Sequence, residues 1–259
     1  TPMVFVVWQS RARVLAADGA TTLSWGRMAT VARAARGWAS VGGPSAWGGM
    51  KFGHTDPTRS HAGLDALVLM AYGWRGRATT LTPADVSGPG FEDFVRALEA
   101  ADPANDRGTA SSGEFLQTLA LQGPGRYDVA MVYESQAIES MELARARWGE
   151  SLRVYYPPIN VWSDHPLCLL DAPHRTARER DAAERLADHL RGADAQAAAV
   201  RRGFRPGDVR VAVVTDDADN PFVKYRGQGI TVALSQVADP PPQATLDALV
   251  VTWRRATRR

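Results

Sequence analysis

The stretch MKFGHTDPTRSHAG, residues 50–63, contains the end of a strand, an Asp-Pro turn and the start of a helix, in that order. Residues 50–53 have a strand-like pattern, and apolar side chains at helical spacing follow over residues 64–72. Thr58 and Ser60 therefore lie at a helix N-terminus. Such an end carries unpaired amides and partial positive charge, which favour an anion or a small polar ligand.

Strand and helix patterns alternate along the rest of the chain. Strands are expected at residues 3–7, 128–133, 152–155, 209–214 and 230–234, with a long extended run at 159–170. Further helices are expected near residues 91–98, 112–119, 136–147 and 246–253, and two more within 176–203, split near Gly192. This alternation predicts an α/β fold with a mostly parallel sheet, in which ligands bind at the carboxyl ends of the strands.

Polar residues that follow the expected strands or begin the expected helices are the candidate ligand contacts. Besides Thr58 and Ser60 they are Ser10, Ser111, Ser112, Tyr133 and Glu134. Hydroxyl groups at such positions can donate to a ligand, but they also cap helices and close turns, so both interpretations stay open for the serines and Thr58. Tyr133 is equally consistent with half-buried packing at a strand end.

Glu134 bears on the kind of ligand. A carboxylate beside an oxyanion repels it by about 1 kcal/mol even when both are well solvated, which argues against molybdate, tungstate or sulfate. A ligand with a cationic or hydroxyl-bearing part would suit Glu134 better. Alternatively, Glu134 points away from the ligand and pairs with an arginine, such as Arg59 or Arg126.

Composition and charge narrow the function classes. Thirty basic and 28 acidic residues are spread along the chain and leave a net charge of +2, so no nucleic-acid partner is expected. The single cysteine, Cys168, excludes an intrachain disulfide and a Cys-x-x-Cys metal site. His54, Asp56 and His61 do not have the spacing of a metal site, and we expect neither a metal nor a cofactor.

Five segments, in this order, resemble the type 2 periplasmic (extracellular) solute-binding proteins, close to the molybdate-binding branch. They are Val4-Phe5-Val6-Val7; Gly53-His54-Thr55-Asp56-Pro57 leading to Ala62-Gly63; Tyr127 to Glu134; Tyr155-Tyr156-Pro157; and Val200 to Pro206. Each segment alone is weakly specific, but together they span nearly the whole chain.

The resemblance implies a two-lobed fold of the periplasmic-binding-protein type 2 kind, with two crossover segments between the lobes. Residues 1–10 would be the first crossover strand, 11–155 a complete lobe, and 156–259 the second crossover with the remainder of the other lobe. Family members have further chain before the first crossover, so this first lobe is expected to be incomplete. We expect a fragment, although a trimmed product or completion by another polypeptide would give the same pattern.

The function that the resemblance implies is non-catalytic. We expect a monomer, periplasmic or extracellular, that captures a small polar molecule or oxyanion in the cleft for the membrane permease of an ABC-type transporter. A missing N-terminal segment would allow a lipid anchor. Two alternatives are an enzyme on the same scaffold, with His54, Asp56 and Glu134 as its acid–base groups, and the ligand-sensing domain of a regulator.

Overall fold

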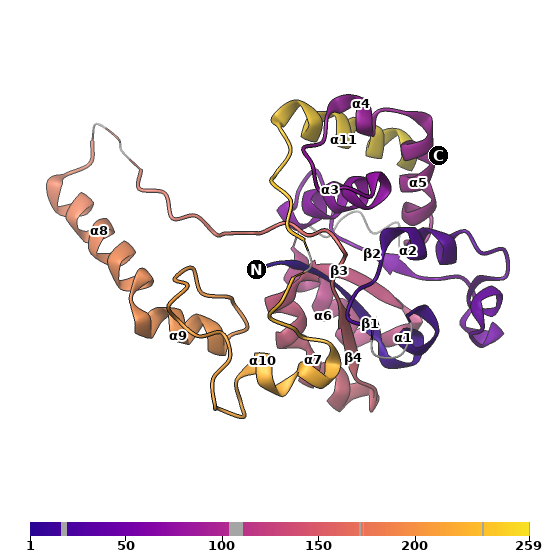
Figure 1. The fold of residues 1–259 in the computed structure, drawn as a ribbon, viewed down its shortest axis with the longest axis horizontal. Helices are drawn as coiled ribbons and strands as arrows, with labels where there is room; N and C mark the ends of the chain where they lie inside the picture. The colour runs from indigo at the N-terminus through magenta and orange to yellow at the C-terminus, as the bar shows by residue number, and fades with distance from the viewer. Residues whose placement is uncertain (17–19, 104–110, 171, 173, 235, 259) are drawn as a thin grey trace.

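The computed structural model describes residues 1–259 except 17–19, 104–110, 171, 173, 235 and 259. A four-stranded sheet lies at its centre, with strands in the order β2-β3-β1-β4 (Figure 1). The strands are β1 (Met3–Trp8), β2 (Phe52–Gly53), β3 (Val129–Tyr133) and β4 (Leu152–Tyr155). The strands expected near residues 3–7, 50–53, 128–133 and 152–155 are therefore confirmed.

The prediction of a mostly parallel sheet needs correction at β1. β2 pairs with β3 in parallel, whereas β1 lies between β3 and β4 and is antiparallel to both. β2, β3 and β4 therefore run in one direction, as alternation of strands and helices requires. β1 runs in the opposite direction, so its carboxyl end lies at the other edge of the sheet.

Helices cover both faces of the sheet. One face carries α1 (Gln9–Leu15), α2 (Trp25–Ala32), α3 (His61–Arg75) and α5 (Pro89–Glu99), with α4 (Pro83–Val86) and α11 (Gln243–Thr257) packed outside α3. The other face carries α6 (Ser112–Gln122), α7 (Glu134–Trp148) and α10 (Pro221–Lys224). Short 3-10 turns lie at Gly37–Val41, Ser45–Trp47, Gly123–Gly125 and Arg226–Gln228.

β1 is apolar at every position because both of its faces are buried. Met3, Phe5 and Val7 point into the core under α2, α3 and α5. Val4, Val6 and Trp8 point into the core under α6 and α7. Six consecutive buried side chains on a strand are the expected result of a sheet enclosed between two helical layers.

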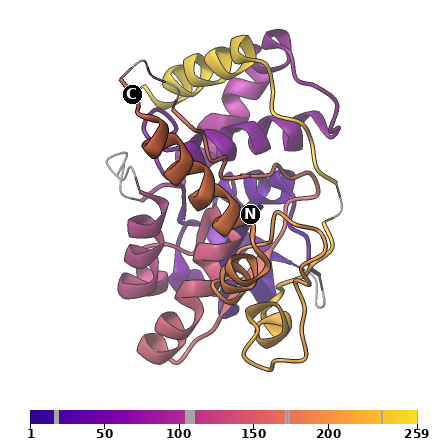
Figure 2. The same ribbon diagram turned by 90° about the vertical axis from the view of Figure 1, so that its left-hand side faces the viewer.

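A helical arm extends from this body. It consists of α8 (Ala177–Arg191) and α9 (Ala193–Arg201), which Figure 1 shows projecting away from the sheet and which lie in front of the body in Figure 2. The predicted division near Gly192 is confirmed. The extended chain that leads into the arm exposes the side chains of Leu167, Leu169 and Leu170.

Two predicted strands are wrong. Residues 209–214 and 230–234 form no strand in the described part of the chain, and Val209 is 97% exposed. The extended run at 159–170 makes only isolated bridges, such as Asn160 with Val237. A strand is stable only when it pairs with another strand, and the described residues provide no partner for these two segments. An apolar pattern alone does not show whether such a partner exists.

The final helix also departs from the predicted division into lobes. α11 packs on α3, α4 and α5, which belong to residues 11–155, although residues 156–259 were expected to form the other lobe. Thr245 and Thr252 hold it there by donating hydrogen bonds to the carbonyls of Leu81 and Val86. Among the described residues, no helix combines the length and the apolar character needed to cross a membrane.

Candidate functional site

The chain segments that follow β2 and β3 meet the N-terminus of α6 at one edge of the sheet. β2 and β3 are parallel, so the turn after Gly53 and the N-terminus of α7 after Tyr133 lie at the same edge. The N-terminus of α3 begins at the end of that turn. The N-terminus of α6 joins the same edge, because the side-chain amide of Gln136 donates a hydrogen bond of 2.8 Å to Ser112 Oγ. We call this region the ligand edge.

Thr58 and Ser60 lie in the turn that precedes α3. Thr58 donates from both its amide and its hydroxyl to Asp56 Oδ1, each at 2.7 Å. Ser60 is the N-cap residue of α3, yet its side chain makes no capping bond and instead accepts a hydrogen bond of 2.8 Å from Thr55 Oγ1. The capping interpretation therefore does not describe the Ser60 hydroxyl.

The turn lies directly against the first turn of α3 at Gly63. A Cβ atom at position 63 would be 2.3 Å from the carbonyl oxygen of Thr55 and 2.8 Å from the backbone of Asp56 and Pro57. Only glycine allows this approach, because backbone atoms cannot give way as a flexible side chain can.

Substitution of Gly63 should therefore displace the turn that carries Thr58 and Ser60. Gly63→Ala is expected to lower the free energy of unfolding by about 1–3 kcal/mol, the usual cost of overpacking. Urea unfolding followed by circular dichroism measures it. Gly76→Ala is no useful control, because Gly76 has φ of +64°; Gly88→Ala is suitable, since a Cβ there meets nothing within 4 Å. Equal midpoints for the Gly63 and Gly88 variants would contradict the prediction.

Tyr133 faces the start of α3. Its hydroxyl donates a hydrogen bond of 3.3 Å to Asp65 Oδ2, and His61 Nε2 lies 3.6 Å from the same oxygen. Burial raises the pKa of Asp65, although the neighbouring His61 and Tyr133 oppose that effect. Burial, and then the negative charge of Asp65, raise the pKa of Tyr133, so its hydroxyl keeps its proton and donates.

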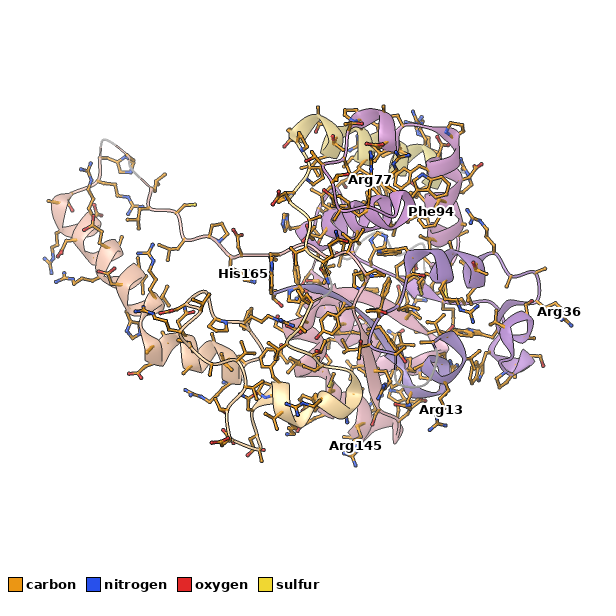
Figure 3. All side chains as sticks on the ribbon, viewed as in Figure 1. Arg13, Arg36, Arg77, Phe94, Arg145 and His165 are labelled. Atoms are coloured by element: carbon orange, nitrogen blue, oxygen red, sulfur yellow. The ribbon has the colours of Figure 1, made fainter. Side chains whose placement is uncertain are left out.

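Asp65 and His165 also lie at this edge, and neither was among the predicted site residues. Asp65 is a buried acid next to an apolar helical face, and a charged residue so placed is the signal that could have revealed it. The His165 ring lies between Tyr133 and Phe204, with ring centroids 6.4 Å and 5.6 Å away (Figure 3). Among the described residues, His165 is the non-glycine residue with positive φ, at 50°.

The two serines at the start of α6 have different roles. Ser111 Oγ accepts a hydrogen bond from the amide of Glu114, as the capping interpretation predicted. Ser112 is buried and accepts the hydrogen bond from Gln136. Ser112 therefore links the N-termini of α6 and α7 at the ligand edge.

Glu134 is neutralised within the protein. Its carboxylate is fully buried and receives two hydrogen bonds of 2.8 Å from Arg205, from Nε and from one terminal nitrogen. Tyr156 donates a third hydrogen bond, and burial with the Glu134 charge raises the pKa of Tyr156. Burial would lower the pKa of Arg205, but Glu134 outweighs that effect and raises it.

This pairing corrects two expectations. Glu134 does pair with an arginine, but the partner is Arg205 and not Arg59 or Arg126, because the chain after α9 returns to the N-terminus of α7. A neutralised Glu134 no longer argues against an anionic ligand. It is a structural residue at the edge of the site.

Ser10 lies at the opposite edge of the sheet. β1 pairs Met3 with Tyr133 and Val7 with Val129, so the residues after Trp8 are at the far end from Tyr133. Ser10 accepts a hydrogen bond of 2.9 Å from Arg11, and its amide donates to Glu150 Oε1 at 2.6 Å. The structure thus brings Thr58, Ser60, Ser111, Ser112, Tyr133 and Glu134 to one edge and separates Ser10 from them.

The groups considered for acid–base chemistry or metal binding have other partners. His54 Nε2 lies 2.8 Å from Glu99 Oε1. Burial alone would lower the pKa of His54. The negative charge of Glu99 and its hydrogen bond with His54 outweigh burial, so the pKa of His54 is raised. In the part of the chain that the structure describes, no group of three His, Cys, Asp or Glu side chains is placed to hold a metal ion.

An enclosed sheet with polar groups and three helix N-termini at one edge is typical of a protein that binds a small molecule rather than a macromolecule. The chain belongs to the family of bacterial extracellular solute-binding proteins, whose model matches residues 1–205. No curated relative matches it. Neither this match nor the structural likeness below distinguishes the molybdate-binding branch, which stays a prediction.

A solved structure with a similar fold is that of a Streptococcus pneumoniae solute-binding protein in complex with the blood group A-trisaccharide. The two chains are 13% identical with a TM-score of 0.57. The match covers 99% of this chain and 65% of the other, so this chain spans less than two thirds of that protein. The likeness confirms the predicted α/β, two-lobed fold class.

Proposed function

We propose that this chain is an extracytoplasmic solute-binding protein that holds a small polar or anionic solute against the ligand edge. The observation that carries the proposal is the meeting of the α3, α6 and α7 N-termini with Ser60, Ser112 and Tyr133 at one sheet edge. Unpaired first-turn amides and hydroxyl groups together form a donor-rich surface for solute oxygens. Family membership supports a binding role without catalysis.

The wider setting is part of the same proposal. Residues 11–155 form one lobe, and residues from 156 onward contribute to the other, apart from α11, with a solute enclosed by closure of the two. The protein acts outside the cytoplasm as a monomer and delivers its solute to the permease of an ABC-type transporter. A lipid anchor is one means of keeping such a protein at the membrane.

Tyr133 offers the most direct test. Tyr133→Phe removes one hydroxyl and keeps the ring, so the affinity for the solute should fall about 5- to 10-fold, the usual effect of one lost hydrogen bond. A thermal-shift screen of polar solutes with the 259-residue chain identifies a ligand, and calorimetry then measures both proteins.

Tyr155→Phe is the matched control, because Tyr155 is buried on β4 and its hydroxyl makes no hydrogen bond with a described residue. Its affinity should equal that of the unchanged chain. If Tyr133→Phe binds the solute as tightly as the control does, the Tyr133 hydroxyl does not contact the solute.

A further inference from the structure

An open groove of about 550 Å³ begins at the ligand edge. One wall is the face of α7 that starts with Ser135 and Gln136, and the other is the chain between Arg201 and Tyr225. Phe204 lines the groove and also contacts the His165 ring, which in turn contacts Tyr133 at the ligand edge. Its size falls within the range of about 300–1,000 Å³ that is usual for small-molecule sites.

The two walls carry opposite charges. Glu139 and Glu142 stand on the α7 wall, whereas Arg201, Arg202 and Lys224 stand on the facing wall together with Asp219. Lys224 forms an ion pair with Glu142 and also interacts with the charge of Asp219. This leaves Glu139 on one side and two guanidinium groups on the other.

These remaining charges are available to a ligand. Among the residues that the structure describes, Glu139, Arg201 and Arg202 have no side-chain hydrogen bond and no ion pair with one another or with any other group. Each is solvent-exposed at the rim of the groove. Among these described residues, the open groove therefore has an unpaired negative charge on the α7 wall and two unpaired positive charges on the facing wall.

A buried acceptor marks the inner end of the groove. Gln136 donates from Nε2 to Ser112, but its Oε1 atom is buried and has no hydrogen-bond partner. A buried acceptor without a donor costs about 1–3 kcal/mol, so a donor from a bound molecule would relieve that cost. Because this atom is closed to solvent, only a local rearrangement of Gln136 would present it to a donor, so the choice of ligand rests on the exposed charges of the two walls.

Charge complementarity then distinguishes the ligand classes. A simple oxyanion would find Arg201 and Arg202 but would also face Glu139, and a simple cation would meet the reverse problem. A neutral ligand would desolvate these charges and give them no partner. A molecule with both charges satisfies both walls.

We propose that the groove binds a small zwitterion, an amino acid or a short peptide, with its ammonium group toward Glu139 and its carboxylate toward Arg201 and Arg202. This inference rests on the proposed function, because it names the class of solute for that binding role and places it in a groove next to the ligand edge. Bidentate pairing of the carboxylate with a guanidinium group would fix the orientation of the ligand.

Calorimetry with the 259-residue chain tests the inference. The probes are the common free amino acids and diglycine, together with acetate, methylamine, sulfate, molybdate and a neutral trisaccharide. At least one zwitterion should bind, and at least tenfold more tightly than acetate or methylamine. Glu139→Gln, and separately the double variant Arg201→Gln with Arg202→Gln, should each weaken that zwitterion at least tenfold.

Two charge-matched controls should leave the affinity unchanged. Arg13→Gln removes an exposed positive charge on α1, far from the groove (Figure 3), and Asp93→Asn removes a carboxylate that is 73% exposed on α5. Thermal unfolding of each variant shows that it is folded.

The outcomes separate this inference from the proposed function. If sulfate, molybdate or the trisaccharide binds and the groove variants do not weaken it, the zwitterion is wrong and the solute-binding role stands. If a zwitterion binds equally well to all variants, the groove is not its site. If no probe binds, both proposals fail.

Discussion

Arg205→Met is expected to lower the free energy of unfolding by about 3–5 kcal/mol. The substitution leaves Glu134 fully buried without its counter-charge, and an uncompensated buried charge is among the most costly defects of a folded protein. Arg205 also donates a hydrogen bond of 2.7 Å to the carbonyl of Thr231, which is lost as well. Urea unfolding followed by tryptophan fluorescence gives the difference.

A second variant shows that the charge, and not the loss of packing, is responsible. Glu134→Gln combined with Arg205→Met removes both charges and should recover a substantial part of the lost stability. Arg145→Met, on the exposed surface of α7 (Figure 3), should stay within about 0.5 kcal/mol of the unchanged protein. If Arg205→Met unfolds at the same urea concentration as Arg145→Met, the buried ion pair contributes nothing measurable.

Asp128→Ala should have an effect of similar size at the opposite edge of the sheet. Asp128 is fully buried and accepts hydrogen bonds from Arg11 Nε at 2.8 Å, Trp38 Nε1 at 3.0 Å and the amide of Lys51 at 2.9 Å. The Lys51 ammonium lies 3.0 Å from the same carboxylate. Removing the Asp128 carboxylate takes this acceptor from the positive charges of Arg11 and Lys51 and from the indole N–H of Trp38. We therefore expect the free energy of unfolding to fall by about 3–5 kcal/mol.

A graded series separates charge from hydrogen bonding at this position. Asp128→Asn keeps one acceptor oxygen and loses the negative charge, so its stability should lie between those of the unchanged protein and Asp128→Ala. Asp93→Asn on the surface of α5 is the control, since that carboxylate is 73% exposed. Equal stability of Asp128→Ala and Asp93→Asn would show that the network is dispensable.

The sequence predicted those elements whose pattern depends on local chemistry or on complete burial. The apolar run before Gln9 and the run ending at Tyr133 are strands because both faces of the sheet are covered, and continuous apolar character records that burial. The helical spacing of apolar residues over 64–72 predicted α3, because the face of a helix that packs on a core repeats every three to four residues. Helix ends were less certain, as α7 begins at Glu134, two residues before the predicted start.

The direction of β1 could not be predicted from the sequence. A strand pattern has a period of two in either direction, so a mostly parallel sheet was predicted and Ser10 was placed with the other site residues. Pairing with β3 and β4 decides the direction, and those partners lie more than a hundred positions away along the chain. Two further strand predictions, 209–214 and 230–234, were wrong because the apolar pattern says nothing about whether a neighbouring strand exists.

The partners of the charged side chains were equally hidden. Glu134 was predicted to follow the strand that ends at Tyr133, and it does, but the arginine that neutralises it comes from the chain after α9. Asp65 lies within the apolar pattern of α3, and its partner Tyr133 is 68 positions away along the chain. Local sequence shows where a charged group lies, whereas only the folded arrangement shows which group it meets.

The long-range pairing of β1 has a consequence for how quickly the chain reaches its native state. The side-chain amide of Asn160 donates a hydrogen bond to the carbonyl oxygen of Met3, 157 positions earlier in the chain. The strands are joined into one sheet only when β1 is inserted between β3 and β4. Closing so large a loop precedes any energetic gain, so folding should be slow compared with helical proteins of the same size. During synthesis the apolar segment Met3–Trp8 must wait for most of the chain to emerge, and in that interval its exposed side chains favour aggregation.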